Sequence, residues 1–230
     1  MAVVGVAPYS SGGNSAVASI YNYGGTWSFV RMGTTGQALY TTGSSDHDVR
    51  IEWVSGGRAK YGITRLFSWF DVSPYAGNIT SLTLTVKSSG VRGGIVARVI
   101  QGTAFLVNTS ATSALQDYNN FIITDYSSTF TWLASTFTVT LNSTSTSAAN
   151  SAGKLGICIM ANDDYTDNSP GGTSSDDYGD LNKSTPSTSL TLNVTYSTGF
   201  SHIVNGVTAV NIDKINGVTR TDIDSINGVS

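Results

Sequence analysis

Charged residues are what this 230-residue sequence has least of. Asp, Glu, Lys and Arg make up only 12% of it, about half of the roughly 25% found in ordinary soluble domains. Because it has a single glutamate (Glu52) and five lysines, it is poor in residues that favour helices. The net charge of -3 and the absence of clustered Lys and Arg argue against a nucleic-acid partner. Solubility therefore rests on hydroxyl and amide groups.

Cysteines and long apolar runs are also scarce. Cys158 is the only cysteine, which excludes an intrachain disulfide framework and a cysteine-based zinc cage. No apolar run approaches the roughly 20 residues that span a bilayer. Residues 1–7 lack the cationic region that begins a signal peptide. We expect a chain that folds in a reducing cytoplasm and has no membrane partner.

Serine and threonine are abundant, and they alternate with apolar residues in several segments. Period-2 alternation predicts half-buried strands over 82–86, 137–141 and 190–196. The runs 155–160 and 65–72 are apolar on both faces and predict more deeply buried strands. Paired glycines mark turns between such segments. The sequence predicts an all-β fold, an antiparallel β-sandwich of jelly-roll type, with one short helix over 111–120.

The chain divides into three predicted parts. Residues 1–30 form an N-terminal arm or the first strands, residues 31–198 form the β-sandwich, and residues 199–230 form a tail. In the tail a Val/Ile-Asn-Gly-Val motif recurs every 11 positions. So few repeats cannot build their own core, because repeats bury each other only when several are stacked. The apolar residues expected to dock the tail are Val204, Val207, Ile212, Ile215, Val218, Ile223, Ile226 and Val229.

The conformation of the tail has two interpretations. A polar residue before each Ile-Asp pair and a glycine after it predict single helical turns over 211–216 and 222–227. The alternative takes each Asn-Gly pair as a type I′ hairpin turn. The surface that receives the tail is the body of the same chain, a second copy, or a larger assembly. The even spacing favours a repetitive or symmetric partner that is bound as a linear peptide is bound.

Catalytic chemistry finds little support in the sequence. A glycosidase would have to use two aspartates, and the only histidines, His47 and His202, lie in a Gly/Ser-rich segment and at the head of the tail. No phosphate-binding loop and no zinc-ligand spacing occurs. We therefore expect a protein that is not an enzyme and has no cofactor. An acidic stretch could supply oxygen ligands for calcium, although its spacing matches no EF-hand. That stretch comprises Asp163, Asp164, Asp167, Asp176, Asp177 and Asp180.

Aromatic residues offer a possible glycan contact. Sugars stack on exposed rings, whereas most large aromatic side chains are buried. Trp69 lies in the densest apolar run and is expected in the core. The remaining candidates for a glycan contact are Trp53, Tyr165 and Tyr178.

Two groups of motifs resemble known families. The Ile-Asn-Gly-Val repeats resemble those that close many structural proteins of tailed bacteriophages. Three segments of the body are similar to jelly-roll domains of the DNRLRE and carbohydrate-binding-module type. These are Arg65-Leu-Phe-Ser-Trp-Phe-Asp71, Ile79-Thr-Ser-Leu-Thr-Leu-Thr-Val86, and the closing strand from Pro186 to Tyr196. Leu190 stands four residues after Pro186 where the family pattern has two.

The resemblance implies a non-enzymatic virion protein, made in the host cytoplasm. It would be a capsid decoration, head-fibre or tail accessory component, anchored through its terminal segments. Its partners would be other virion proteins and copies of itself, since cyclic symmetry multiplies a weak contact. The alternative that the same resemblance implies is a carbohydrate-binding module used for adhesion to a host surface.

Overall fold

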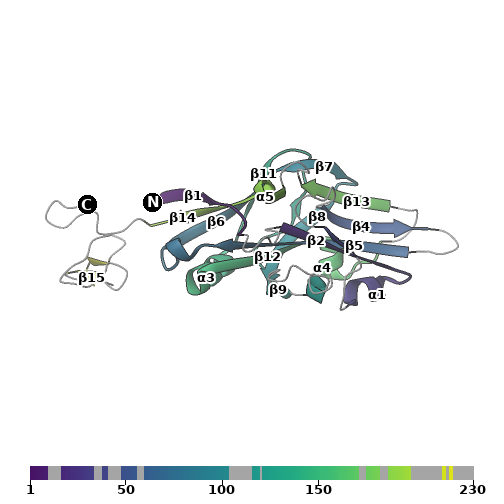
Figure 1. The fold of residues 1–230 in the computed structure, drawn as a ribbon, viewed down its shortest axis with the longest axis horizontal. Helices are drawn as coiled ribbons and strands as arrows, with labels where there is room; N and C mark the ends of the chain where they lie inside the picture. The colour runs from purple at the N-terminus through teal and green to yellow at the C-terminus, as the bar shows by residue number, and fades with distance from the viewer. Residues whose placement is uncertain are drawn as a thin grey trace.

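The protein is described by a computed structural model, which places most of the body and a small part of the tail (Figure 1). The residues that it describes are 1–9, 17–33, 38–40, 48–55, 60–103, 116–119, 121–170, 175–181, 186–197, 214–215 and 218–219. In this part of the chain, two antiparallel sheets share one apolar core, and the fold is the expected all-β sandwich.

The smaller sheet has four strands. Their order is β1 (Ala2–Val6), β14 (Leu190–Tyr196), β6 (Ile79–Val86) and β11 (Phe137–Thr140). The predicted alternation is confirmed, because Leu82, Leu84 and Val86 are buried while Thr83 and Thr85 point to the opposite face. That outer face carries hydroxyl and amide groups, and Asn193 donates hydrogen bonds from Nδ2 to the hydroxyls of Thr83 and Thr85 on the neighbouring strand.

The larger sheet is built around its longest strand. Its main path is β10 (Phe130–Thr131), β8 (Val96–Gly102), β12 (Lys154–Ala161), β5 (Lys60–Asp71), β4 (Asp48–Val54), β13 (Ser175–Leu181) and β7 (Ser88–Arg92). Three further strands join it: β2 (Val17–Gly24) on β5, β3 (Ala38–Tyr40) on β2, and β9 (Phe121–Asp125) on β8. The two runs predicted to be apolar on both faces, 65–72 and 155–160, lie largely in β5 and in β12.

Strand β5 has 12 residues and belongs to two parts of the sheet. Along one edge it pairs first with β4, over residues 60–64, and then with β12, over residues 66–71. Strand β2 pairs along its other edge. Strand β5 therefore connects the strands that share the core with the smaller sheet to those at the far end, where β4, β13 and β7 lie (Figure 1).

The described residues also contain several short helical segments. The helical segments are α1 (Trp27–Met32), η1 (Ser73–Tyr75), η2 (Gln116–Asn119), α3 (Ser143–Ala152), α4 (Asn162–Thr166) and α5 (Pro186–Ser189). Of the short helix predicted over 111–120, the structure describes residues 116–119 as a 3-10 helix, and the rest lies outside the described residues. Helix α5 explains the late position of Leu190, because the residues after Pro186 form a helical turn before β14 begins.

Helix α3 was not predicted, yet its ends carry ordinary helix signals. The side chain of Asn142 accepts a hydrogen bond from the backbone N–H of Ser145, and the helix ends at Gly153 with a φ of 64°. The helix contacts β6 of one sheet and β12 of the other. The side chain of Asn150 bonds both backbone groups of Ile79, at 2.9 and 2.8 Å. Helix α3 thus bridges the two sheets.

The N-terminal residues are integrated into the sandwich. Strand β1 pairs with β14, and β2 pairs with β5 over eight residues. Within residues 1–30 the structure describes these two strands and the start of α1.

Only four residues of the repeat tail are described. Lys214–Ile215 (β15) and Val218–Thr219 (β16) pair antiparallel, with Ile215 opposite Val218. These four residues do not decide between the hairpin and the helical-turn interpretations, and both stay predictions for the tail. The turn expected over 222–227 and the other docking residues, Val204, Val207, Ile212, Ile223, Ile226 and Val229, lie outside the described residues.

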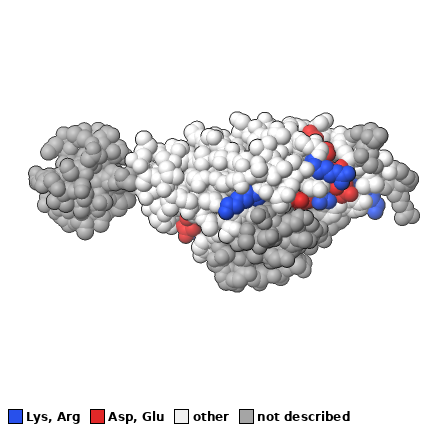
Figure 2. Space-filling model, turned by 90° about the horizontal axis from the view of Figure 1, so that it is seen from above, with Lys and Arg blue, Asp and Glu red and all other residues white. Residues whose placement is uncertain are grey.

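Charge is distributed unevenly over the body. Figure 2 shows charged side chains gathered at the end where β4, β7 and β13 lie, while the rest of the described surface in this view is almost uncharged. No helix in the described residues is long and apolar enough to cross a bilayer.

Candidate functional site

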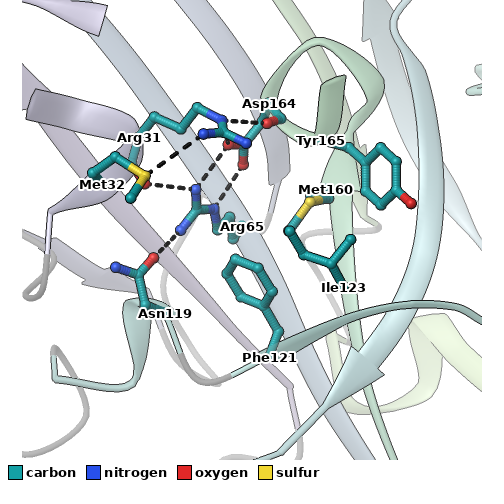
Figure 3. A pocket seen from close by; sticks show the side chains of 9 residues that line it. All are labelled: Arg31, Met32, Arg65, Asn119, Phe121, Ile123, Met160, Asp164 and Tyr165. Carbon is teal, nitrogen blue, oxygen red and sulfur yellow. Dashed lines mark hydrogen bonds and ion pairs between the residues drawn. The ribbon is translucent and has the colours of Figure 1, made fainter. Parts of the chain in front are cut away.

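A pocket lies where β5, α1, η2, β9 and α4 meet. Its volume is about 340 Å³. The residues that line it are Arg31, Met32, Arg65, Asn119, Phe121, Ile123, Met160, Asp164 and Tyr165 (Figure 3). Met32 and Ile123 are well exposed at its rim, with 63% and 59% of their surface accessible. The pocket thus combines an apolar mouth with an ion pair on its wall.

The ion pair joins the buried side chains of Arg65 and Asp164. The guanidinium donates from Nε and Nη2 to the two carboxylate oxygens of Asp164, at 2.6 and 2.8 Å. It also donates to the carbonyl oxygens of Tyr118 and Arg31 and to the side-chain oxygen of Asn119. All five N–H donors of Arg65 are therefore used.

Electrostatics favour the charged form of Arg65. Burial by itself lowers the pKa of Arg65, but the charge and hydrogen bonds of Asp164, together with Tyr118 and Cys158, outweigh burial, so the pKa lies above its ordinary value. Burial raises the pKa values of Tyr118 and of the adjacent Cys158, which keeps both groups protonated at neutral pH. Arg31 adds a hydrogen bond from Nε to the backbone carbonyl of Asp164, at 2.7 Å.

The arrangement favours a structural role for Arg65. Its contacts connect β5 to α1, η2 and α4, segments that are far apart in the sequence. Both carboxylate oxygens of Asp164 face the guanidinium, so this carboxylate is committed to the ion pair. What the pocket offers a ligand is the apolar surface of Met32, Phe121 and Ile123.

The residues proposed for glycan contact are not brought together. Trp53 pairs with Ser175, and Tyr178 pairs with Arg50 on the same two strands. Because successive residues of a strand point to opposite faces, Trp53 and Tyr178 lie on opposite faces of the sheet. Trp53 packs against Tyr61, with ring centroids 4.3 Å apart. Tyr165 is on α4, where the guanidinium of Arg98 lies 3.8 Å from its ring. These three residues do not form one platform.

The acidic stretch is divided among separate contacts. Asp164 pairs with Arg65, Asp167 accepts a hydrogen bond from Trp27 Nε1 at 2.9 Å, and Asp176 lies 3.6 Å from both Arg50 and Arg92. In the part of the chain that the structure describes, no group of three or more potential ligands is placed to hold a metal ion. The calcium hypothesis therefore gains no support from the geometry of these residues. His47 and His202 lie outside the described residues.

Asp177 is the least favourably placed carboxylate of this stretch. Burial, followed by the neighbouring Asp176 and Asp163 carboxylates, raises its pKa above the ordinary value of 3.8. A raised pKa means that the folded state binds the proton more tightly than the unfolded chain, so stability falls as the pH rises from the ordinary pKa through the raised one and stays lower above it.

We expect Asp177→Asn to raise Tm at pH 7, because the substitution removes this unfavourable charge. The difference from the wild type should disappear near pH 3, where the native Asp177 is protonated, in thermal unfolding followed by circular dichroism. Asp176→Asn is the matched control and should lower Tm at pH 7, since Asp176 has two arginines beside it. A lower Tm for Asp177→Asn at pH 7 would contradict the assignment.

The Arg65 cluster was missed by the sequence analysis. Its partner Asp164 is 99 residues away, and no local pattern connects the two. The one available signal was an arginine within the apolar run 65–72, since a buried arginine requires a partner.

Comparisons with known proteins give no further assignment. No protein-family model matches the chain, and a search of curated proteins finds no similar sequence.

Proposed function

We propose that the protein is a non-enzymatic structural component of a virion, in which a jelly-roll-like β-sandwich is fastened through its C-terminal repeats. It would be a capsid decoration, head-fibre or tail accessory component that associates with other virion proteins and with copies of itself. The repeats support this proposal through their resemblance to those of phage structural proteins, and the strand motifs of the body support the jelly-roll part of it through their resemblance to jelly-roll domains. The structure adds one supporting feature, which is the position of the last strand of the sandwich.

The last strand of the body completes the core before the tail begins. Strand β14 lies inside the four-stranded sheet, between β1 and β6, and buries Leu190, Leu192 and Val194. The backbone N–H of Ser197 then donates to the carbonyl of Asn78, at 2.9 Å, and fixes the end of the strand. Strand β14 is the last strand of the described sandwich. We assign the attachment role to the repeats that follow it in the sequence.

Deletion of residues 199–230 tests this role. We expect the shortened chain to unfold with a Tm within about 2 °C of the full chain, a change of less than about 1 kcal/mol for this size. It should lose self-association in sedimentation velocity and should no longer co-sediment with virions from its source. A shortened chain that still co-sediments with virions would refute the attachment role.

Point variants in the full chain separate apolar docking from a general effect of the tail. The double variant Ile215→Ser with Ile226→Ser removes one apolar residue from each of two equivalent repeats. The matched controls are Lys214→Ser and Ser225→Ala, which change the residue directly before each isoleucine. We expect the isoleucine variants to reduce co-sedimentation at least tenfold, which corresponds to about 1.4 kcal/mol, and the controls to leave it unchanged.

A further inference from the structure

The smaller sheet ends in a strand with an open edge. Strand β1 lies at the margin of this sheet and pairs with β14 through all five of its residues, without a register shift (Figure 1). No strand of the described chain pairs along its other edge. In an antiparallel pair, alternate residues bond the neighbouring strand, and those between them direct their N–H and C=O groups away from it. Strand β1 therefore presents backbone groups with which a further strand can pair.

The side chains of β1 leave apolar surface uncovered. Val4 and Val6 pack against the core but remain half-buried. Val3 points to the outer face of the sheet and is 69% exposed. Gly5 follows on the same outer face and has no side chain. A strand added at this edge would cover valine side chains on both faces.

This edge lacks the devices that normally prevent pairing between molecules. Proteins protect open edges with charged side chains, prolines, bulges or very short strands. Strand β1 has none of these, and the four strands of the smaller sheet contain no Asp, Glu, Lys or Arg.

The other described edges differ from β1. Strand β7 ends at Arg92 and β9 at Asp125, and the pairing of each with its neighbour contains a register shift. Strands β3 and β10 have only three and two residues. Strand β11, at the other side of the smaller sheet, lines a small pocket together with residues 128–130. Among the described edges, β1 is thus the one that is both five residues long and unprotected.

The sequence of β1 is complementary to a second copy of itself. When two β1 strands are set antiparallel with Val4 opposite Val4, all five residues are paired and each side chain meets one on the same face. Ala2 then lies opposite Val6 of the second copy, and the exposed Val3 lies opposite Gly5. The valine side chain thus extends over a position without one. Such a contact uses the same surface on both copies and closes at two, and the absence of charge leaves no repulsion to overcome.

We propose that β1 pairs with β1 of a second copy across a two-fold axis, so that two four-stranded sheets join into one sheet of eight strands. Five residue pairs bury less than the roughly 1,200 Å² of the smaller stable interfaces, so this contact orients copies that their tails hold on one assembly. To that extent the inference rests on the proposed function. Because β14 ends beside Ala2, the tails of the two copies leave the joined sheet at opposite ends. Such a pair would connect two attachment points.

Disulfide trapping in the full chain tests the pairing and its register. Opposed residues of an antiparallel pair have Cα atoms about 4.5–5.5 Å apart, within the range that a disulfide spans. We expect Val4→Cys to form a covalent dimer under mild oxidation, seen on a non-reducing gel. Val3→Cys is the matched control, because its two copies lie diagonally, about 7–8 Å apart, and it should give at least fivefold less dimer. The wild type should give none, since Cys158 is buried.

A lysine on the edge provides a second test. Val3→Lys, added to Val4→Cys, places a charge at an exposed position and should lower the yield of dimer at least tenfold without a change in the circular dichroism spectrum. Thr138→Lys is the matched control, since it adds the same charge at an exposed position of β11, and it should leave the yield unchanged.

Three results would overturn the proposal: no dimer from Val4→Cys, equal yields at residues 3 and 4, or a yield that survives Val3→Lys. Pairing of β1 with β11 or with a tail strand of another copy would give the first of these. A full chain that co-sediments with virions while Val4→Cys gives no dimer refutes the β1 contact and leaves the attachment role intact. A Val4→Cys dimer that does not co-sediment with virions supports the β1 contact and refutes the attachment role.

Discussion

Asp164→Asn is expected to lower the free energy of unfolding by about 3–5 kcal/mol, because it leaves the buried guanidinium of Arg65 without a counter-charge. The side chain of Arg65 is 2% exposed and that of Asp164 is 1% exposed. The substitution preserves the shape of the side chain while removing its charge, so the loss reports the charge rather than a cavity. Urea unfolding followed by tryptophan fluorescence measures it.

Two further variants show whether the loss of stability comes from breaking an ion pair as such or from leaving the buried charge of Arg65 without a partner. Asp125→Asn removes the partner of Arg98 in a pair whose carboxylate is 42% exposed, and should cost no more than about 1 kcal/mol. The double variant Arg65→Met with Asp164→Leu removes both charges and should be more stable than Asp164→Asn. A loss below about 1 kcal/mol for Asp164→Asn would contradict the assigned role of this pair in joining β5 to α1, η2 and α4.

Trp132→Ala is expected to destabilise the fold by about 3–5 kcal/mol, the usual cost of truncating a large buried aromatic side chain. Trp132 is 1% exposed, and its Nε1 donates to the hydroxyl of Ser88 at 2.9 Å. Its ring lies against Gly179, where an added Cβ would be 2.3 Å from the ring. Phe137 packs edge-on at 5.5 Å. The tryptophan thus fills the space that the glycine of β13 leaves open.

The Trp132 ring can pack as it does only because residue 179 has no side chain, and variants at Gly179 therefore serve as controls. Gly179→Ala alone should cost about 1–3 kcal/mol by overpacking. Combined with Trp132→Ala it should cost less than the sum of the two losses, because the added methyl then enters the vacated space. Trp53→Ala, at a half-buried position, should cost clearly less than Trp132→Ala. Equal losses at the two tryptophans, measured by urea unfolding, would contradict the packing described for β13.

The strands could be predicted because their signal is local. Leu82, Leu84 and Val86 alternate with Thr83 and Thr85, and this pattern directly determines which face is buried. Helix α3 could not be predicted by composition, since Ser and Thr are weak helix formers. Its signals were Asn142 at the start and Gly153 at the end. Contact of its middle with both sheets outweighs its low propensity, and sequence alone does not contain that contact.

The candidate sites required information that the sequence does not carry locally. Trp53 and Tyr178 appeared to be suitable partners by residue type, but the register of β4 with β13 directs them to opposite faces. Tyr21 and Tyr178 are 157 positions apart in the sequence, yet the same register rules place them in one row. Pairing between distant strands therefore decides which aromatic residues can act together.

The position of β14 also determines how a pulling force on the tail is transmitted to the body. The tail continues from the end of a strand that has a hydrogen-bonded neighbour on each side, β1 and β6, and both run antiparallel to it. Tension along this strand acts on both ladders at once, in shear, instead of opening them one bond after another. A body attached in this way resists being torn from its anchor mainly through the same strand that completes its core.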